Sequence, residues 1–154
     1  MSTKFSTSTV FLSVVLLLSC TEVVNGLSDS IPAFIKDVHT VRQGPDSFAV
    51  CFSLRDDKMV DTISDGKATI EIIQTPYLSY KGSQTVLFNQ TRQVLKADFN
   101  EATLGARQYC FGPISNSQFS ELNPNGANYA VVNIFFTTPN GKVLSSQCDL
   151  PIPL

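Results

Sequence analysis

The sequence lacks tryptophan, has a single histidine and holds few charged residues of either sign. Lysine and arginine number 11 against 13 acidic residues, and the net charge is -2. Proteins that bind nucleic acid need clustered basic side chains against the phosphate backbone, so we expect no nucleic-acid partner. Of the 154 residues, 43% are hydrophobic and 16% are charged, unlike a disordered chain. The length fits one folded domain.

The N-terminal segment 1–26 has the pattern of a secretory signal peptide. Lys4 provides a positive start, and the apolar run Val10 to Leu18 is too short to cross a bilayer. Small residues permit cleavage after Gly26, which we favour, or near Cys20. Retention of the segment as an N-terminal anchor is the alternative.

The remaining residues, 27–154, form the predicted mature domain. They contain no further stretch long enough to span a membrane, so we expect a protein that is secreted or resides in an endolysosomal or vacuolar lumen. Asn89-Gln90-Thr91 is an N-glycosylation sequon that this route could use at Asn89.

Three cysteines, Cys51, Cys110 and Cys148, remain after cleavage at Gly26. In an oxidising compartment they allow one internal bridge and one free thiol, whereas cleavage upstream of Cys20 would make the number even. The sequence has no Cys-x-x-Cys motif and no acidic cluster at ligand spacing. We therefore expect no metal site and no cofactor.

Apolar residues recur with a period of two, which is typical of strands. The pattern is clearest over Phe48–Leu54, Ala68–Ile73 and Tyr129–Thr138. Pro139-Asn140-Gly141 then predicts a tight hairpin into a strand over Val143–Leu150, because Asn-Gly tolerates positive φ angles.

Further strands are predicted at Ala33–Val41, Gln84–Asn89 and Gln93–Phe99, with a turn signal at Gly112-Pro113. Only Asn100–Gly105 indicates a helical turn. About seven short strands at this spacing predict an all-β fold, an immunoglobulin-like antiparallel β-sandwich.

The inward faces of these strands are rich in phenylalanine, isoleucine and valine. The expected lining residues are Phe34, Phe48, Val50, Phe52, Ile70, Ile72, Phe88, Phe99, Phe111, Val132, Ile134 and Phe136. They could close on each other as an ordinary core. Alternatively the sheets splay and leave a dry cavity for an apolar ligand, and composition alone does not choose.

Catalytic and metal chemistry find little support. His39 would have to serve any Ser-His-Asp or Cys-His arrangement, and it lies in no recognisable catalytic motif. Asp56, Asp57, Asp61 and Asp65 match no calcium-loop spacing and are better explained as a solvated turn. We expect a protein that is not an enzyme.

The C-terminal part of the chain contains a Pro-Asn-Gly turn, a strand that starts at Tyr129, an Asn-Gly turn and a strand that carries Cys148. In this order it resembles the C-terminal hairpin of the ML lipid-recognition domains, which include Niemann–Pick type C sterol carriers and secreted phosphatidylglycerol and phosphatidylinositol transfer proteins. Ser64–Ile72 and Phe34–Val38 are similar to two further strands of that family. Cys110–Ile114 is similar to its Cys-Pro-Ile corner.

Two departures from the family concern cysteines. The chain has no cysteine near Ser28, where the family places the partner of its last cysteine, and none just before the corner, while Cys51 sits in mid-strand. Two disulfide pairings therefore stay open. Cys20 could pair with Cys148, or Cys51, Cys110 and Cys148 could form a nonstandard bridge.

The resemblance implies a lipid carrier that holds a sterol or a phospholipid acyl chain between its sheets and delivers it to a membrane or receptor acceptor. Each buried methylene is worth about 0.8 kcal/mol, so affinity needs no specific polar contact. Pro76, Tyr77 and Tyr80 fall where the family has a portal loop, and tyrosine offers an apolar ring with a polar tip. These residues could equally cap the end of a sheet.

A competing interpretation is a fibronectin- or immunoglobulin-like adhesion module with a solid core. Leu122, Pro124 and Tyr129 resemble the tyrosine corner of those folds, with one residue more than the usual spacing. Such a module would bind proteins through loops or edges.

Overall fold

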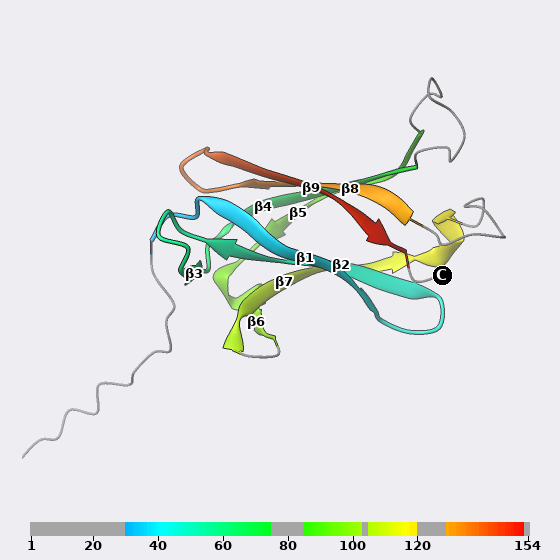
Figure 1. Cartoon of the computed structure of the whole chain (residues 1–154), viewed down its shortest axis with the longest axis horizontal. Coiled ribbons are helices and arrows are strands. Elements are labelled where there is room, and N and C mark those ends of the chain that lie inside the picture. The colour runs from blue at the N-terminus through cyan, green and yellow to red at the C-terminus, as the bar shows by residue number, and fades with distance from the viewer. Residues whose placement is uncertain (1–29, 75–84, 103–104, 120–128, 153–154) are drawn as a thin grey trace, which may run out of the picture.

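The computed structural model describes residues 30–74, 85–102, 105–119 and 129–152 as two antiparallel sheets packed face to face (Figure 1). The predicted signal segment lies outside the described residues. Within the ranges described, no helix has the length and apolar character of a membrane span.

The first sheet has the order β1-β2-β7-β6, with β3 beside β2, and the second sheet has the order β5-β4-β8-β9. The strands of the first sheet are β1 (Phe34–Arg42), β2 (Ser47–Arg55), β3 (Asp61–Thr62), β6 (Asn100–Glu101) and β7 (Arg107–Ser115). Those of the second are β4 (Gly66–Gln74), β5 (Thr85–Val94), β8 (Tyr129–Thr137) and β9 (Val143–Pro151). Two short 3-10 segments are η1 (Lys96–Asp98) and η3 (Asn116–Phe119).

The predicted all-β sandwich is confirmed. Seven of the described strands have nine or ten residues, and β3 and β6 have two each. In immunoglobulin constant domains the fourth strand pairs with the fifth. Here β5, the fourth long strand, pairs instead with the third, β4, so the second sheet has four long strands and the first has three.

The alternation of apolar residues along β4 and β8 explains which of their side chains are buried. On β4 and β8, Ile70 pairs with Ile134 and Ile72 with Val132, and all four side chains are fully buried. Since neighbouring side chains on a strand point to opposite faces, this register aligns one apolar face along both strands. The predicted hairpin between β8 and β9 is also confirmed, with Gly141 at a φ of 84°.

The region that begins at residue 85 differs from the sequence prediction. One strand, β5, replaces the two expected at Gln84–Asn89 and Gln93–Phe99, because it pairs with β4 along almost its whole length. The chain then turns at η1, where the Asp98 carboxylate accepts the backbone N–H of Leu95 at 2.8 Å. The helical turn predicted over Asn100–Gly105 is wrong for Asn100 and Glu101, which form β6, but a turn is present at its end, where the Gly105 N–H donates to the Ala102 carbonyl at 3.2 Å.

Gly112-Pro113, predicted as a turn, lies inside β7 with a cis peptide bond. The register between β2 and β7 shifts here, so that both Phe111 and Ile114 face the core. A Cβ at Gly112 would lie 2.6 Å from the Cβ of Ala49, so only glycine fits this close approach. The Gly-Pro pair therefore forms an irregularity within the strand and does not reverse the direction of the chain.

Phe34 does not face the interior as predicted. It is 44% exposed, and its neighbour Ile35 is buried in its place. A bulge lies between Lys36 and His39, and Asp37 within it has a φ of 53°. The extra residue reverses the side on which alternate residues point, so alternation across β1 predicts the wrong face before the bulge.

Candidate functional site

The predicted interior exists as one continuous core between the sheets. Eleven of the twelve expected lining residues are at most 6% exposed; Phe34 is the exception. The eleven are Phe48, Val50, Phe52, Ile70, Ile72, Phe88, Phe99, Phe111, Val132, Ile134 and Phe136.

Aromatic rings join the two sheets directly. Phe52 of the first sheet meets Phe136 of the second with ring centroids 6.2 Å apart, and Phe88 meets Phe111 at 6.1 Å. Both pairs are edge-to-face, the arrangement that the ring quadrupole favours. At these points the protein's own side chains fill the space between the layers.

The flank where β1 lies beside β9 is closed by hydrogen bonds (Figure 1). The Thr40 hydroxyl donates to the carbonyl of Pro151 at 2.8 Å, and the Lys142 ammonium donates to the carbonyl of Pro32 at 3.2 Å. Here the edges of the two sheets are connected through polar groups as well as through the core.

The opposite flank, where β5 faces β7, is closed by a side chain that crosses between the sheets. Arg92 on β5 donates from Nη1 to the carbonyl of Gly112 at 2.6 Å, and its Cζ lies 4.3 Å from the centroid of Phe111. A guanidinium over a ring face gains a cation–π attraction. We refer to Arg92, Gln90 and Tyr109 as the polar rim.

The register with β4 shows why the polar rim is unusual. Gln90 pairs with Ile70 and Arg92 with Ala68, so both lie on the inward face of β5, between Phe88 and Val94. Across the flank, Tyr109 is 7% exposed and contacts the rings of three phenylalanines, Phe52, Phe99 and Phe111. Burial raises the pKa of Tyr109, while the Arg92 charge acts to lower it. Gln90 and Arg92 were not predicted, because they fall between the two strands expected at Gln84–Asn89 and Gln93–Phe99.

The disulfide is Cys51–Cys110, and Cys148 is free and half-buried. Burial, with a smaller contribution from the neighbouring carboxylate of Asp149, raises the pKa of the Cys148 thiol. Of the two pairings left open by the sequence, a nonstandard bridge among Cys51, Cys110 and Cys148 is present, and the pairing of Cys20 with Cys148 lies outside the described residues. A buried disulfide fits an oxidising secreted or lumenal environment.

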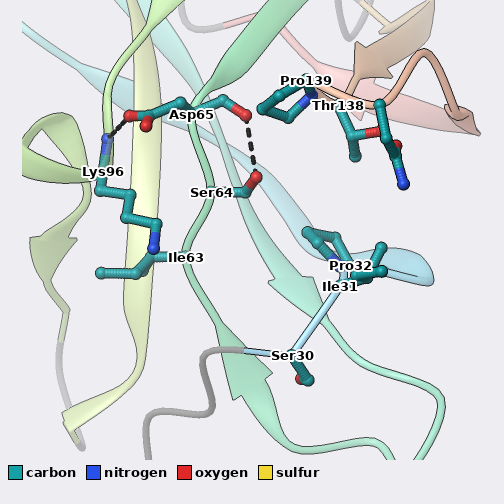
Figure 2. Close-up of a pocket in the computed structure, with 10 residues that line it drawn as sticks. Ser30, Ile31, Pro32, Ile63, Ser64, Asp65, Lys96, Thr138 and Pro139 are labelled. Atoms are coloured by element: carbon teal, nitrogen blue, oxygen red, sulfur yellow. Dashed lines mark hydrogen bonds between the residues drawn. The ribbon is translucent and has the colours of Figure 1, made fainter.

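A pocket of about 380 Å³ opens at the end of the sandwich where the chain before β1, the β3–β4 connection and the β8–β9 turn meet (Figure 2). Asp65 accepts the backbone N–H of Lys96 at 2.8 Å, and the Ser64 hydroxyl donates to the Asp65 carbonyl. Its lining contains none of the predicted cavity residues. It comprises Ser30, Ile31, Pro32, Ile63, Ser64, Asp65, Lys96, Thr138, Pro139 and Asn140.

The acidic residues near β3 serve the local structure. Asp56 is 2% exposed, so the expected solvated turn is wrong for this residue. Its carboxylate accepts the backbone N–H groups of Lys58 and Val60 at 2.9 and 2.8 Å. Asp61 pairs with Arg55 at 3.0 Å. In the described part of the chain no three potential metal ligands cluster.

His39 is exposed, and its Nδ1 lies 2.8 Å from the carbonyl oxygen of Asp37. The residue opposite it on β2 is Cys51, whose sulfur is in the disulfide and therefore not a nucleophile. The geometry around His39 offers no catalytic arrangement among the described residues.

The predicted portal residues Pro76, Tyr77 and Tyr80 lie outside the described residues, as do Leu122 and Pro124 of the predicted tyrosine corner. Comparisons of the chain with family models, with curated proteins and with solved structures found no match.

Proposed function

We propose that this domain binds a lipid, a sterol or a phospholipid acyl chain, between its two sheets and transfers it to a membrane or receptor acceptor. The observation that carries the proposal is the apolar inner layer: eleven expected lining residues from both sheets form one continuous core. Removing an acyl chain from water into such a layer is worth about 0.8 kcal/mol for each methylene.

Entry would occur by separation of the sheets at the β5–β7 flank. Among the described residues, β5 meets the first sheet there through Arg92, Phe88 and its contact with η3, whereas β1 and β9 lie against each other on the other side. The disulfide joins β2 to β7 within the first sheet and therefore does not resist such an opening. The Phe88–Phe111 pair would have to part to admit a chain.

The proposal includes the location and surface of the protein. The segment 1–26 acts as a signal peptide, the domain is secreted or lumenal, and Asn89 carries an N-linked glycan. Asn89 supports this because it is exposed on the edge strand β5. Pro76, Tyr77 and Tyr80 form the portal in this proposal.

A second candidate, an adhesion or interaction module with a solid core, is favoured by the two ring pairs that bridge the sheets. Native mass spectrometry of the secreted protein separates the two candidates. We expect an added mass that organic extraction removes and that lipid analysis identifies as a sterol or phospholipid. A protein that emerges empty and takes up no lipid from vesicles would support the interaction module and overturn lipid binding.

A further inference from the structure

Arg92 is a cation in an unusual position for a β-sandwich. It lies on the inward face of β5, the row that otherwise contributes Phe88 and Val94 to the core, and its side chain is half-buried. Among the described residues, no carboxylate forms an ion pair with Arg92, in contrast to Arg55, which pairs with Asp37 and Asp61.

The described groups around the Arg92 guanidinium use only part of its hydrogen-bonding capacity. One nitrogen donates to the Gly112 carbonyl at 2.6 Å, and one ring face, that of Phe111, lies at 4.3 Å. A guanidinium has five N–H donors, and a neutral carbonyl with a ring compensates its charge only in part. A carboxylate or phosphate forms stronger, charge-assisted bonds with arginine.

Tyr109 supplies a second polar group at the same place. It belongs to the first sheet, it is 7% exposed, and its ring centroid lies 6.4 Å from that of Phe111, the ring that the Arg92 guanidinium covers. The charge of Arg92 acts to lower the pKa of Tyr109. The Asp98 carboxylate, which also acts on Tyr109, accepts the Leu95 N–H at 2.8 Å. The polar rim therefore combines a cation and a hydroxyl at the edge of an apolar interior.

We propose that the polar rim binds the anionic headgroup of the lipid, a carboxylate or a phosphate, with Arg92 as the principal contact and Tyr109 as a second donor. This inference rests on the proposed lipid function. The anion takes the place of the Gly112 carbonyl, so the bond that closes the β5–β7 flank is exchanged for one to the ligand. A neutral sterol or alcohol offers no such exchange.

An inward-pointing charge on an edge strand also guards a sheet against pairing with other chains, and that role requires no ligand. The two roles differ in one measurable respect. Only a headgroup site makes binding depend on the charge of the lipid.

The test compares three ligands that share one chain: oleate, oleyl alcohol and oleoyl lysophosphatidylglycerol. Their dissociation constants are measured by calorimetry on the delipidated protein, wild type, Arg92→Gln and Arg92→Lys. Lys67→Gln is the matched control, because Lys67 is exposed on the outer face of the second sheet.

We expect the wild type to bind at least one anionic ligand about tenfold more tightly than oleyl alcohol. Arg92→Gln should abolish this preference without weakening oleyl alcohol binding, Arg92→Lys should keep part of it, and Lys67→Gln should keep all of it. Whether oleate or the lysophospholipid shows the preference identifies the headgroup as carboxylate or phosphate.

Equal binding of all three ligands to the wild type would overturn the headgroup site and leave lipid binding intact. The same holds if the preference survives in Arg92→Gln. If none of the three ligands binds the wild type, the headgroup site is overturned, and the proposed function fails as well if the protein also takes up no sterol from vesicles. Near-ultraviolet circular dichroism of each variant shows whether the fold is kept, and Arg92→Lys provides the test if Arg92→Gln does not fold.

Discussion

Cys51 on β2 lies directly opposite Cys110 on β7, and the disulfide between them joins two strands of one sheet, with the Cα atoms 4.1 Å apart. Immunoglobulin domains place their disulfide between the two sheets. Here the bond stabilises the first sheet and leaves the contact between the sheets to side chains. Among the described residues, no disulfide joins one layer to the other.

Removal of the disulfide should destabilise the fold strongly. The two cysteines are 59 residues apart in sequence, and for such a loop the chain-entropy account predicts a loss of about 4 kcal/mol in the free energy of unfolding for Cys51→Ala with Cys110→Ala. Urea unfolding measures it, with Cys148→Ala as the control. An unchanged midpoint in the double variant would contradict the assigned pairing.

Alanine substitutions of Phe136 and Phe34 test which face of β1 packs in the core. Phe136 is fully buried and contacts Phe52 across the sheets, so Phe136→Ala should cost about 3–5 kcal/mol of unfolding free energy. Phe34 is 44% exposed, and Phe34→Ala should cost clearly less, about 1 kcal/mol or below. Denaturant titration compares them, and equal losses would show that Phe34 does pack in the core.

Cys148 should react slowly with iodoacetamide in the folded protein. Burial raises the pKa of its thiol, so at pH 8 less of the reactive thiolate is present than in the unfolded chain. The rate should rise as the pH increases toward the raised pKa, and urea should remove the difference. Intact-mass measurements over time check this, and rapid labelling of native protein at pH 8 would refute it.

Tyr77→Ala tests the proposed portal. Loss of the ring should change the rate of lipid transfer between vesicles while the stability of the domain stays within about 0.5 kcal/mol, because the proposed portal role does not require the ring to pack in the core. A fluorescent lipid exchange assay gives the rate, and urea unfolding gives the stability. The portal proposal fails if the transfer kinetics are those of the wild type.

Glycosylation at Asn89 should be visible as added mass on protein secreted from eukaryotic cells. Its side-chain amide donates to Glu71 at 3.4 Å on the outer face of the second sheet, so a glycan there would not enter the core. Treatment with an amidase that removes N-glycans, or the substitution Asn89→Gln, should remove the mass of the glycan. A difference of only one methylene between wild type and Asn89→Gln would exclude the modification.

The core positions were predictable where alternation runs without interruption. Phe48, Val50 and Phe52 on β2, like Ile134 and Phe136 on β8, are buried as predicted, since a regular strand sends every second side chain to the same face. Local residue order contains this information, because it depends only on the strand period.

The polar rim was not predictable in the same way. Gln90 and Arg92 lie between turn-forming and polar residues, which locally favour an interruption, and pairing with β4 overrides that preference. Their inward position follows from a partner strand about 20 residues earlier in the chain. Single-strand patterns carry no information on such a partner.

The sequence by itself determined the sandwich class, the β8–β9 hairpin and most of the apolar inner layer, because strand period and turn chemistry are local properties. Only the tertiary structure decided that Ile35 replaces Phe34 in the core, that Cys51 bonds to Cys110, and that Arg92 closes the β5–β7 flank. Each of these depends on register between distant strands, and a one-residue shift at a bulge is enough to exchange the inner and outer faces.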